Sequence, residues 1–218
     1  MKPPRRLVQL DVDSTFIQQE AIELLAAKAG VLSEVARITD AAMRGELDFA
    51  QSLIARVALL QGLSATVIDQ VRNEITLTDG AADLVETLHS RGHYVALVSG
   101  GFVNIMQPIV DDLRIDYFRA NTLEIQDGVL TGKVVGSIID RAAKAKALAE
   151  FASDCQVELK DTVAIGDGAN DLDMMAVAGI SIAFNAKPIV AQAADFSITE
   201  PSLASVPVSY THLRAHET

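Results

Sequence analysis

The stretch LVQLDVDSTFIQQE, residues 7–20, places Asp11 and Asp13 one residue apart at the end of a short apolar run. The run has the length and composition of a buried strand, so we expect a strand over residues 6–11. Two carboxylates then stand where this strand ends. Open α/β sheets bind their ligands at the carboxyl ends of the strands. The stretch therefore predicts both a fold and the position of a site.

Two other interpretations of the stretch are weaker. In a calcium loop beginning at Asp11, the sixth residue should be glycine and the twelfth glutamate, but Phe16 and Ile22 occupy those positions. A surface turn does not suit the stretch either, because the aspartates follow an apolar run and no turn glycine accompanies them. The aspartate pair therefore calls for a chemical explanation from the rest of the chain.

Short apolar segments of the same kind recur along the chain and alternate with segments of helical periodicity. Four further strands are predicted in this way, over residues 94–99, 161–167, 180–184 and 195–199. Helices are predicted between strands, for example over residues 80–92 and 141–153. Such alternation is typical of a doubly wound, Rossmann-like parallel sheet, so the sequence predicts an α/β fold.

The alternation is interrupted directly after the first strand. Residues 16–77 show only helical periodicity, in four segments: 17–29, 33–44, 48–61 and 65–74. We expect this insert to form an all-helical cap domain over the carboxyl edge of the sheet. Residues 1–15 and 78–207 would then form the core domain.

Two further segments depart from the alternation. LEIQDGVLTGKVVG, residues 123–136, has the pattern of a hairpin with an Asp-Gly pair at its turn. Residues 208–218 show no amphipathic period, and we expect a disordered or non-native tail there. His212 and His216 have a spacing that could bind a metal on a helix, but the tail gives them no helical context.

The composition narrows the range of partners. With 18 basic and 29 acidic residues, the chain has a formal net charge of −11, which argues against nucleic acid and anionic membranes. The single cysteine, Cys155, excludes an internal disulfide framework, and no neighbouring cation marks it as catalytic. No apolar run is long enough to cross a bilayer. We therefore expect a cytoplasmic protein.

Three later motifs carry side chains that suit the two aspartates. LVSGGF ends a predicted strand with the hydroxyl of Ser99 and two glycines, whose N–H groups can approach an anion closely. VAIGDGANDLDMM ends another strand with Asp167, followed by Asn170 and Asp171. Lys144 lies early in a predicted helix. Each motif alone also has a plain structural explanation, as a turn, a helix cap or a solvated charge.

Together the motifs predict a phosphoryl-transfer site. The ends of parallel strands lie along one edge of a sheet, so we expect Asp11, Asp13, Ser99 and Asp167 to converge there. Carboxylate oxygens are the ligands that Mg²⁺ prefers, and Mg²⁺ often shares its coordination with a substrate phosphate. Carboxylates with Mg²⁺, one hydroxyl and one lysine can hold and attack a phosphoryl group.

The motifs DVDST, LVSGGF, the helical Lys144 and GDGAND stand in the order and approximate spacing of the haloacid dehalogenase-like (HAD) phosphatases. The chain resembles this family from residue 5 to about residue 206. It is most similar to the branch that hydrolyses O-phospho-L-serine in the last step of serine biosynthesis. That similarity rests on four cap residues at the positions of substrate contacts: Glu20, Met43, Phe49 and Arg56. Phe16 and Asp79 depart from the leucine and proline expected there.

The resemblance implies a role for each residue. Asp11 would be the nucleophile that forms an aspartyl-phosphate, and Asp13 would be the general acid and then the general base. Asp11, the main-chain carbonyl of Asp13 and Asp167 would bind Mg²⁺, with Asp171 supporting the metal site. The remaining implied contacts, to the phosphoryl group or the substrate, come from Ser99, Gly100, Lys144 and Asn170. Lys146 is the rival of Lys144, which fits the family spacing better.

Two other functions stay open at this point. One is a HAD phosphatase or phosphotransferase that acts on another small phosphorylated metabolite and needs a different cap. The other is a non-catalytic module that binds Mg²⁺ or a phosphorylated ligand. The sequence also leaves the oligomeric state open, a homodimer included.

Overall fold

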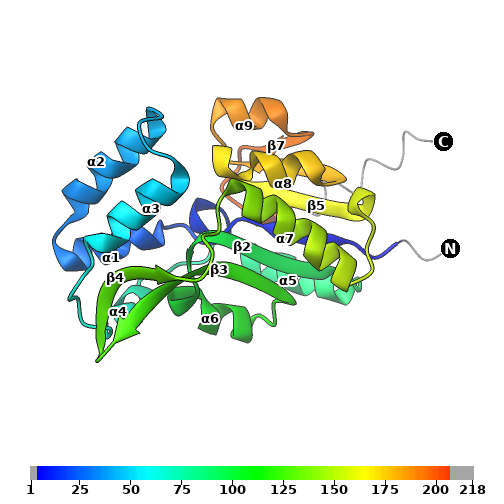
Figure 1. The fold of residues 1–218 in the computed structure, drawn as a ribbon. Coiled ribbons are helices and arrows are strands. Elements are labelled where there is room, and N and C mark those ends of the chain that lie inside the picture. The colour runs from blue at the N-terminus through cyan, green and yellow to red at the C-terminus, as the bar shows by residue number, and fades with distance from the viewer. Residues whose placement is uncertain (1–3, 207–218) are drawn as a thin grey trace.

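A seven-stranded sheet crosses the centre of the molecule, which a computed structural model describes over residues 4–206 (Figure 1). Its strand order is β4-β3-β2-β1-β5-β6-β7. All neighbouring strands are parallel except β3 and β4, so the predicted α/β class and parallel, doubly wound sheet are confirmed. The strands are β1 (Leu7–Leu10), β2 (Tyr94–Phe102), β3 (Tyr117–Gln126), β4 (Val129–Val135), β5 (Thr162–Gly166), β6 (Ile180–Phe184) and β7 (Phe196–Ile198).

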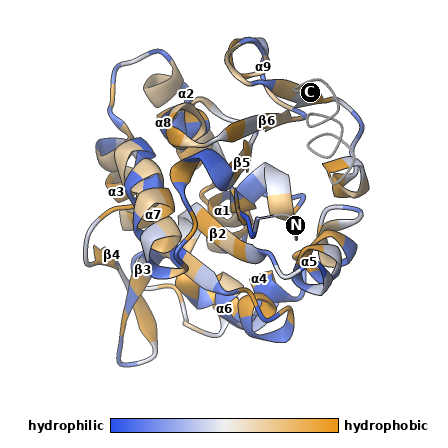
Figure 2. Ribbon diagram, turned by 90° about the vertical axis from the view of Figure 1, so that its right-hand side faces the viewer, coloured by the Kyte–Doolittle hydropathy of each residue, from blue (hydrophilic) through white to orange (hydrophobic). Residues whose placement is uncertain are grey.

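Helices cover both faces of the sheet, and the alternation of side chains along β1 explains how. Val8 and Leu10 belong to the apolar cluster shared with α5 and α6, whereas Leu7 belongs to the cluster shared with α7, α8 and α9. Strands β2 and β6 accordingly carry many hydrophobic residues (Figure 2). The helices on the faces are α5 (Ala81–Ser90), α6 (Val103–Asp112), α7 (Arg141–Asp154), α8 (Leu172–Val177) and α9 (Pro188–Ala193).

The insert between β1 and β2 contains the four helices expected of it. They are α1 (Ala21–Ala29), α2 (Leu32–Met43), α3 (Phe49–Ala58) and α4 (Val67–Arg72). The first begins four residues later than predicted, because Ile17 forms an antiparallel bridge with Leu77 and Gln18 donates its N–H to the Thr76 carbonyl. The two ends of the insert are thus joined by backbone pairing.

The predicted hairpin is present as β3 and β4, with Asp127 and Gly128 at positive φ angles of 51° and 78°. Its first strand begins earlier than the pattern indicated and pairs with β2, so the hairpin belongs to the main sheet. Its side chains Leu123 and Leu130 lie in the same apolar cluster as the buried residues of the cap helices. The Gly62 N–H also donates to the Leu130 carbonyl at 2.8 Å. The hairpin therefore packs against the helical insert as well as the sheet.

Within residues 4–206, no helix combines the length and the apolar character that a membrane span needs. The expectation for residues 208–218, including His212 and His216, falls outside the part of the chain that the structure describes.

Candidate active site

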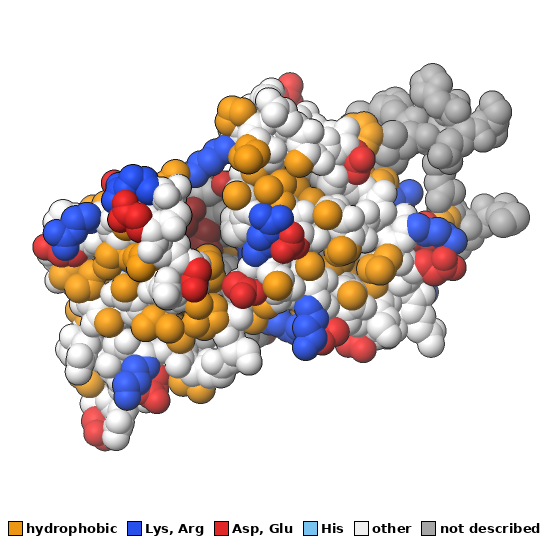
Figure 3. All heavy atoms as spheres, turned by 45° about the horizontal axis from the view of Figure 1, so that its top comes forward, with side chains coloured by type: hydrophobic (Ala, Val, Ile, Leu, Met, Phe, Trp, Pro, Cys, Tyr) orange, Lys and Arg blue, Asp and Glu red, His pale blue; other side chains and the backbone are white. Residues whose placement is uncertain are grey.

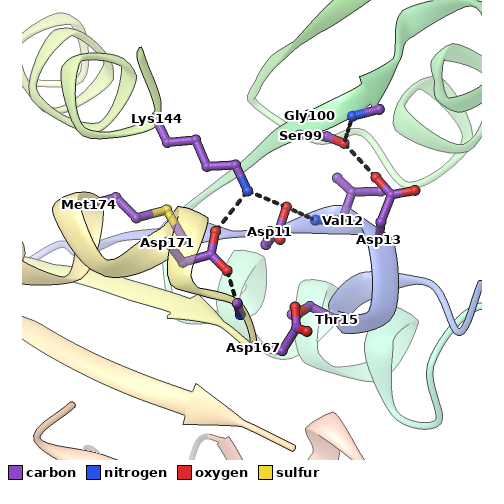
Figure 4. A network of polar contacts seen from close by, with 12 residues as sticks. Asp11, Val12, Asp13, Thr15, Ser99, Gly100, Lys144, Asp167, Asp171 and Met174 are labelled. Carbon is purple, nitrogen blue, oxygen red and sulfur yellow. Dashed lines mark hydrogen bonds and ion pairs between the residues drawn. The ribbon is translucent and has the colours of Figure 1, made fainter. Parts of the chain in front are cut away.

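Asp11 and Asp13 lie at the carboxyl edge of the sheet, where the sequence places them (Figure 4). The Asp11 N–H donates to the Ile165 carbonyl at 2.9 Å and extends the pairing of β1 with β5. The chain then makes one wide turn over Val12–Phe16, in which Ser14 has a φ of 57°. This turn directs the side chain of Asp11 inward, where it is 4% exposed.

Lys144 provides the positive charge beside Asp11. Its Nζ lies 2.6 Å from Asp11 Oδ1 and 2.7 Å from Asp171 Oδ1, and the residue is 1% exposed. Burial opposes the ammonium charge, but the carboxylates of Asp11 and Asp171 more than offset it and raise the pKa of Lys144. Lys146, the rival in the sequence, points to solvent and pairs with Glu150.

Three carboxylates surround this lysine closely enough to hold a metal ion. Asp11, Asp167 and Asp171 each offer an oxygen within 4.8 Å of the others. Burial raises the pKa of Asp11, with a further contribution from Asp171, and Lys144 only partly opposes this. Burial also raises the pKa of Asp167. One ammonium does not compensate the buried carboxylates of Asp11 and Asp171 and the half-buried carboxylate of Asp167, so an all-oxygen donor set with excess negative charge fits a hard divalent cation.

The carboxylate of Asp13 lies outside this cluster and makes different contacts. Its Oδ2 accepts a hydrogen bond from the Ser99 hydroxyl at 2.8 Å, and its Oδ1 accepts one from the Ala21 N–H at 2.8 Å. Ser99 Oγ in turn accepts the Gly101 N–H at 2.6 Å. A Cβ on Gly101 would lie 2.6 Å from Asp13 Oδ2, which explains why glycine occupies this position.

A cavity of about 550 Å³ opens above these groups, between the insert and the sheet edge. Acidic side chains lie deep in the hollow between the two parts of the molecule (Figure 3). Ser99 and Lys144 do not line the cavity but contact Asp13 and Asp11, which do. The predicted site residues on its lining are Asp11, Asp13, Glu20, Met43, Phe49, Arg56, Gly100, Asp167 and Asn170.

The cap wall of the cavity carries charges of both signs, with Glu20 and Glu23 as the acids and Arg56 as the cation. Glu20 accepts a hydrogen bond from the Ser14 hydroxyl at 2.7 Å, and burial, with Asp13 adding to it, raises the pKa of Glu20 to about 7. Burial lowers the pKa of Arg56, and Glu20 opposes this shift. The Phe49 ring lies over Gly100, where a Cβ would come within 2.7 Å of it. The cap therefore presents a carboxylate and a guanidinium above the carboxylates of the core.

Several residues in or beside the site were not identified from the sequence. Thr15 donates its hydroxyl to Asp167 Oδ1 at 3.1 Å, and its place in the DVDST motif could have marked it. Lys187 lines the cavity, and its N–H donates to the Asp167 carbonyl at 3.3 Å. Gln9 is buried and donates from Nε2 to the Lys144 carbonyl at 3.1 Å. A polar residue inside an apolar strand was the available signal for Gln9.

The two departures from the family pattern lie away from the cavity. Phe16 is fully buried in the apolar cluster of β1, α5 and α6. Asp79 accepts the Leu203 N–H at its main-chain carbonyl. Neither residue is part of the cavity lining.

Comparisons with known proteins agree with this arrangement. A sequence model of the haloacid dehalogenase-like hydrolase family matches residues 8–176. The chain is 57% identical to a phosphoserine phosphatase of Streptomyces coelicolor over 93% of its own length, and spans 49% of that relative. It is 50% identical to a phosphoserine phosphatase of Streptococcus thermophilus, covering 94% of this chain and 96% of the relative.

Solved structures with similar folds include a substrate-bound phosphoserine phosphatase complex, at 41% identity and a TM-score of 0.90. Another is a phospho-aspartyl intermediate analogue of phosphoserine phosphatase, at 42% identity and a TM-score of 0.89. Each similarity covers 95% of this chain and 99% of the other.

Proposed function

The chain belongs to the haloacid dehalogenase-like hydrolases, and we propose that it is a cytoplasmic, Mg²⁺-dependent phosphoserine phosphatase. It would hydrolyse O-phospho-L-serine to L-serine and phosphate. The observation that carries the proposal is the buried Asp11, paired with Lys144 at the base of a cavity whose cap wall holds Arg56 and Glu20. The names of relatives similar over nearly their whole length support the same substrate.

Asp11 is the nucleophile in this proposal. Among the described residues, its side-chain contacts are both made by Oδ1, which accepts the Val12 N–H at 2.7 Å and pairs with Lys144. Oδ2 is therefore the oxygen that attacks phosphorus. An aspartyl-phosphate forms as the bond between phosphorus and the serine oxygen breaks, which divides one difficult displacement into two easier ones.

Asp13 transfers protons in both steps. Its carboxyl group, oriented by Ser99 and the Ala21 N–H, protonates the departing serine oxygen. The carboxylate that remains takes a proton from the water that attacks the aspartyl-phosphate. Ser99, the Gly100 amide and Lys144 would offset charge on the transferring oxygens, and Asn170 would contact the phosphate.

The acidic cluster would hold Mg²⁺ through Asp11, Asp167 and the main-chain carbonyl of Asp13, with Asp171 orienting the metal site. When bound, the ion supplies positive charge that offsets the carboxylates and polarises the phosphoryl group. The all-oxygen donor set described above supports Mg²⁺ over softer metals.

The cap would select the substrate. Arg56 presents a planar fork suited to a carboxylate, and Glu20 can accept hydrogen bonds from an ammonium group. Met43 and Phe49 would exclude water above these contacts and strengthen them. A phosphatase for another small metabolite would keep the core groups but would not need this pair of charges.

The test is phosphate release from O-phospho-L-serine with and without Mg²⁺, by the wild type and by Asp11→Asn. We expect Mg²⁺-dependent release by the wild type, no turnover by a folded Asp11→Asn, and modification of Asp11 by beryllium fluoride. Turnover by Asp11→Asn would contradict the covalent mechanism. Release from other phosphomonoesters but not from phosphoserine would favour the alternative substrate class.

A further inference from the structure

Asn121 lies beside an irregularity in the sheet that carries part of the proposed phosphate site. Between the pairs Val98 with Arg119 and Phe102 with Asn121, β2 has three residues where β3 has one. The three are Ser99, Gly100 and Gly101, so their backbone groups leave the regular hydrogen-bond ladder. Buried backbone groups at such a bulge need other partners.

The side chain of Asn121 supplies one of those partners. Its Nδ2 donates to the Gly100 carbonyl at 2.8 Å, and the residue is 1% exposed. The Gly100 carbonyl and the Gly101 N–H belong to one planar peptide. That N–H donates to Ser99 Oγ, and Ser99 donates to Asp13. The orientation of one peptide thus sets the position of the hydroxyl that holds the general acid.

The other atom of the same amide reaches the segment that carries Lys144. Asn121 Oδ1 accepts the Ile139 N–H at 2.9 Å, two residues before α7 begins at Arg141. Lys144 lies in the first turn of α7. The two bonds need a donor and an acceptor on one side chain, and the amide of Asn121 supplies both.

We propose that Asn121 is a positioning residue of the phosphate site, which holds the Gly100–Gly101 peptide and the start of α7 in register. The proposal rests on the proposed function. Asn121 is absent from the cavity lining, so it acts through Ser99, Asp13 and Lys144 rather than on the substrate. Loss of the Asn121 side chain should weaken phosphate binding and slow phosphoryl transfer, which the core performs. Recognition of the serine group by the cap should be unchanged.

The test is Asn121→Asp, which keeps the size and the acceptor for Ile139 but faces the Gly100 carbonyl with a second acceptor. We expect kcat to fall by roughly 10- to 100-fold on both phosphoserine and p-nitrophenyl phosphate. The inhibition constant of inorganic phosphate should rise, whereas that of L-serine should stay within about twofold. If Asn121→Asp does not fold, Asn121→Leu removes both bonds without adding charge and takes its place.

Thr162→Val is the matched control. Thr162 is fully buried at the opposite end of the sheet and also makes two hydrogen bonds, to the Leu159 carbonyl and from the Gly179 N–H. Thr162→Val should lower Tm by about as much as the Asn121 variant does, but should leave kcat unchanged. An Asn121 variant that folds and keeps kcat within about twofold, or equal kcat losses in both variants at equal Tm, would overturn the inference. Hydrolysis of p-nitrophenyl phosphate but not phosphoserine by the wild type would overturn only the proposed substrate, since the p-nitrophenyl phosphate comparison still tests Asn121.

Discussion

Substitution of Arg56 tests whether substrate specificity is set by the cap or by the core. A hydrogen bond to a charged group is worth about 1.5–3 kcal/mol, so Arg56→Ala should lower kcat/KM for phosphoserine roughly 10- to 150-fold. The same variant should hydrolyse p-nitrophenyl phosphate, which lacks a carboxylate, almost as well as the wild type. Arg44→Ala is a suitable control, because Arg44 is exposed, pairs with Glu46 and does not line the cavity. Equal losses on both substrates would mean that Arg56 supports the fold or the phosphate site.

Glu20 should make the stability of the metal-free protein depend on pH. The ordinary pKa of 4.5 applies in the unfolded chain, and burial raises it to about 7 in the folded protein. Between these values the folded protein keeps a proton that the unfolded chain has lost. The contribution of Glu20 to the free energy of unfolding should therefore fall as pH rises from 4.5 to 7, by about 3 kcal/mol, and this contribution should change little above pH 7.

Urea denaturation in EDTA at pH 5 and pH 8 measures this effect. Glu20→Gln has no carboxylate to ionise, so the variant should gain stability relative to the wild type at pH 8 but not at pH 5. The same pH dependence in both proteins would show that Glu20 ionises normally in the folded state.

Helix α2 is the least firmly packed of the longer cap helices. Val35 is its one buried residue, whereas α3 buries Ser52, Leu53 and Val57. Met43, at the end of α2, is 65% exposed although it lines the cavity. Elements with few buried apolar contacts open most easily. We infer that substrate enters by movement of α2 and not of the whole cap.

Hydrogen exchange can test this inference about α2. Amides of residues 32–43 should exchange faster than those of α3, and should slow when beryllium fluoride and L-serine occupy the site. Amides of α7, which packs on the sheet, serve as the internal reference. Uniform exchange across α2 and α3 would instead indicate that the cap moves as one body.

Elements with a clear period could be predicted from the sequence, and elements defined by pairing could not. The strand at Ile180–Phe184 and the hairpin turn follow from local pattern and turn chemistry. The start of α1 was misplaced because Ile17 pairs with Leu77, a partner distant in sequence. The first half of β3 was missed because its residues YFRANT mix polar and apolar side chains without a strict period.

The same distinction applies to the site. The sequence alone was enough to predict that Asp11, Asp13 and Asp167 lie together, because the ends of parallel strands share one edge of a sheet. The proposed role of Asn121 could not be predicted from the sequence, since it depends on the register between β2 and β3. The division into core and cap domains remains a prediction, and the apolar cluster shared by the hairpin and the insert ties the two parts closely.

At the scale of the whole molecule, the acidic cluster should link folding to Mg²⁺. The unfolded chain does not hold Asp11, Asp167 and Asp171 together, so a cation that binds the cluster stabilises only the folded state. At 100 times its dissociation constant, the ion should add about 2.7 kcal/mol to the free energy of unfolding. Thermal unfolding with Mg²⁺ and with EDTA measures this. Asp167→Asn should reduce the difference, and a Tm insensitive to Mg²⁺ in the wild type would argue against the metal site.

Because Phe49 of the cap contacts Gly100 of the core, a larger residue at position 100 should push the cap away from the core. Apart from its chain neighbours, the three atoms nearest to a methyl group there would all belong to the Phe49 ring. Gly100→Ala should therefore displace Phe49 and separate cap from core without straining the sheet. Phe49→Ala in the same chain should remove the obstruction. The pair would give crystallographers a trapped open form and a matched partner that can close.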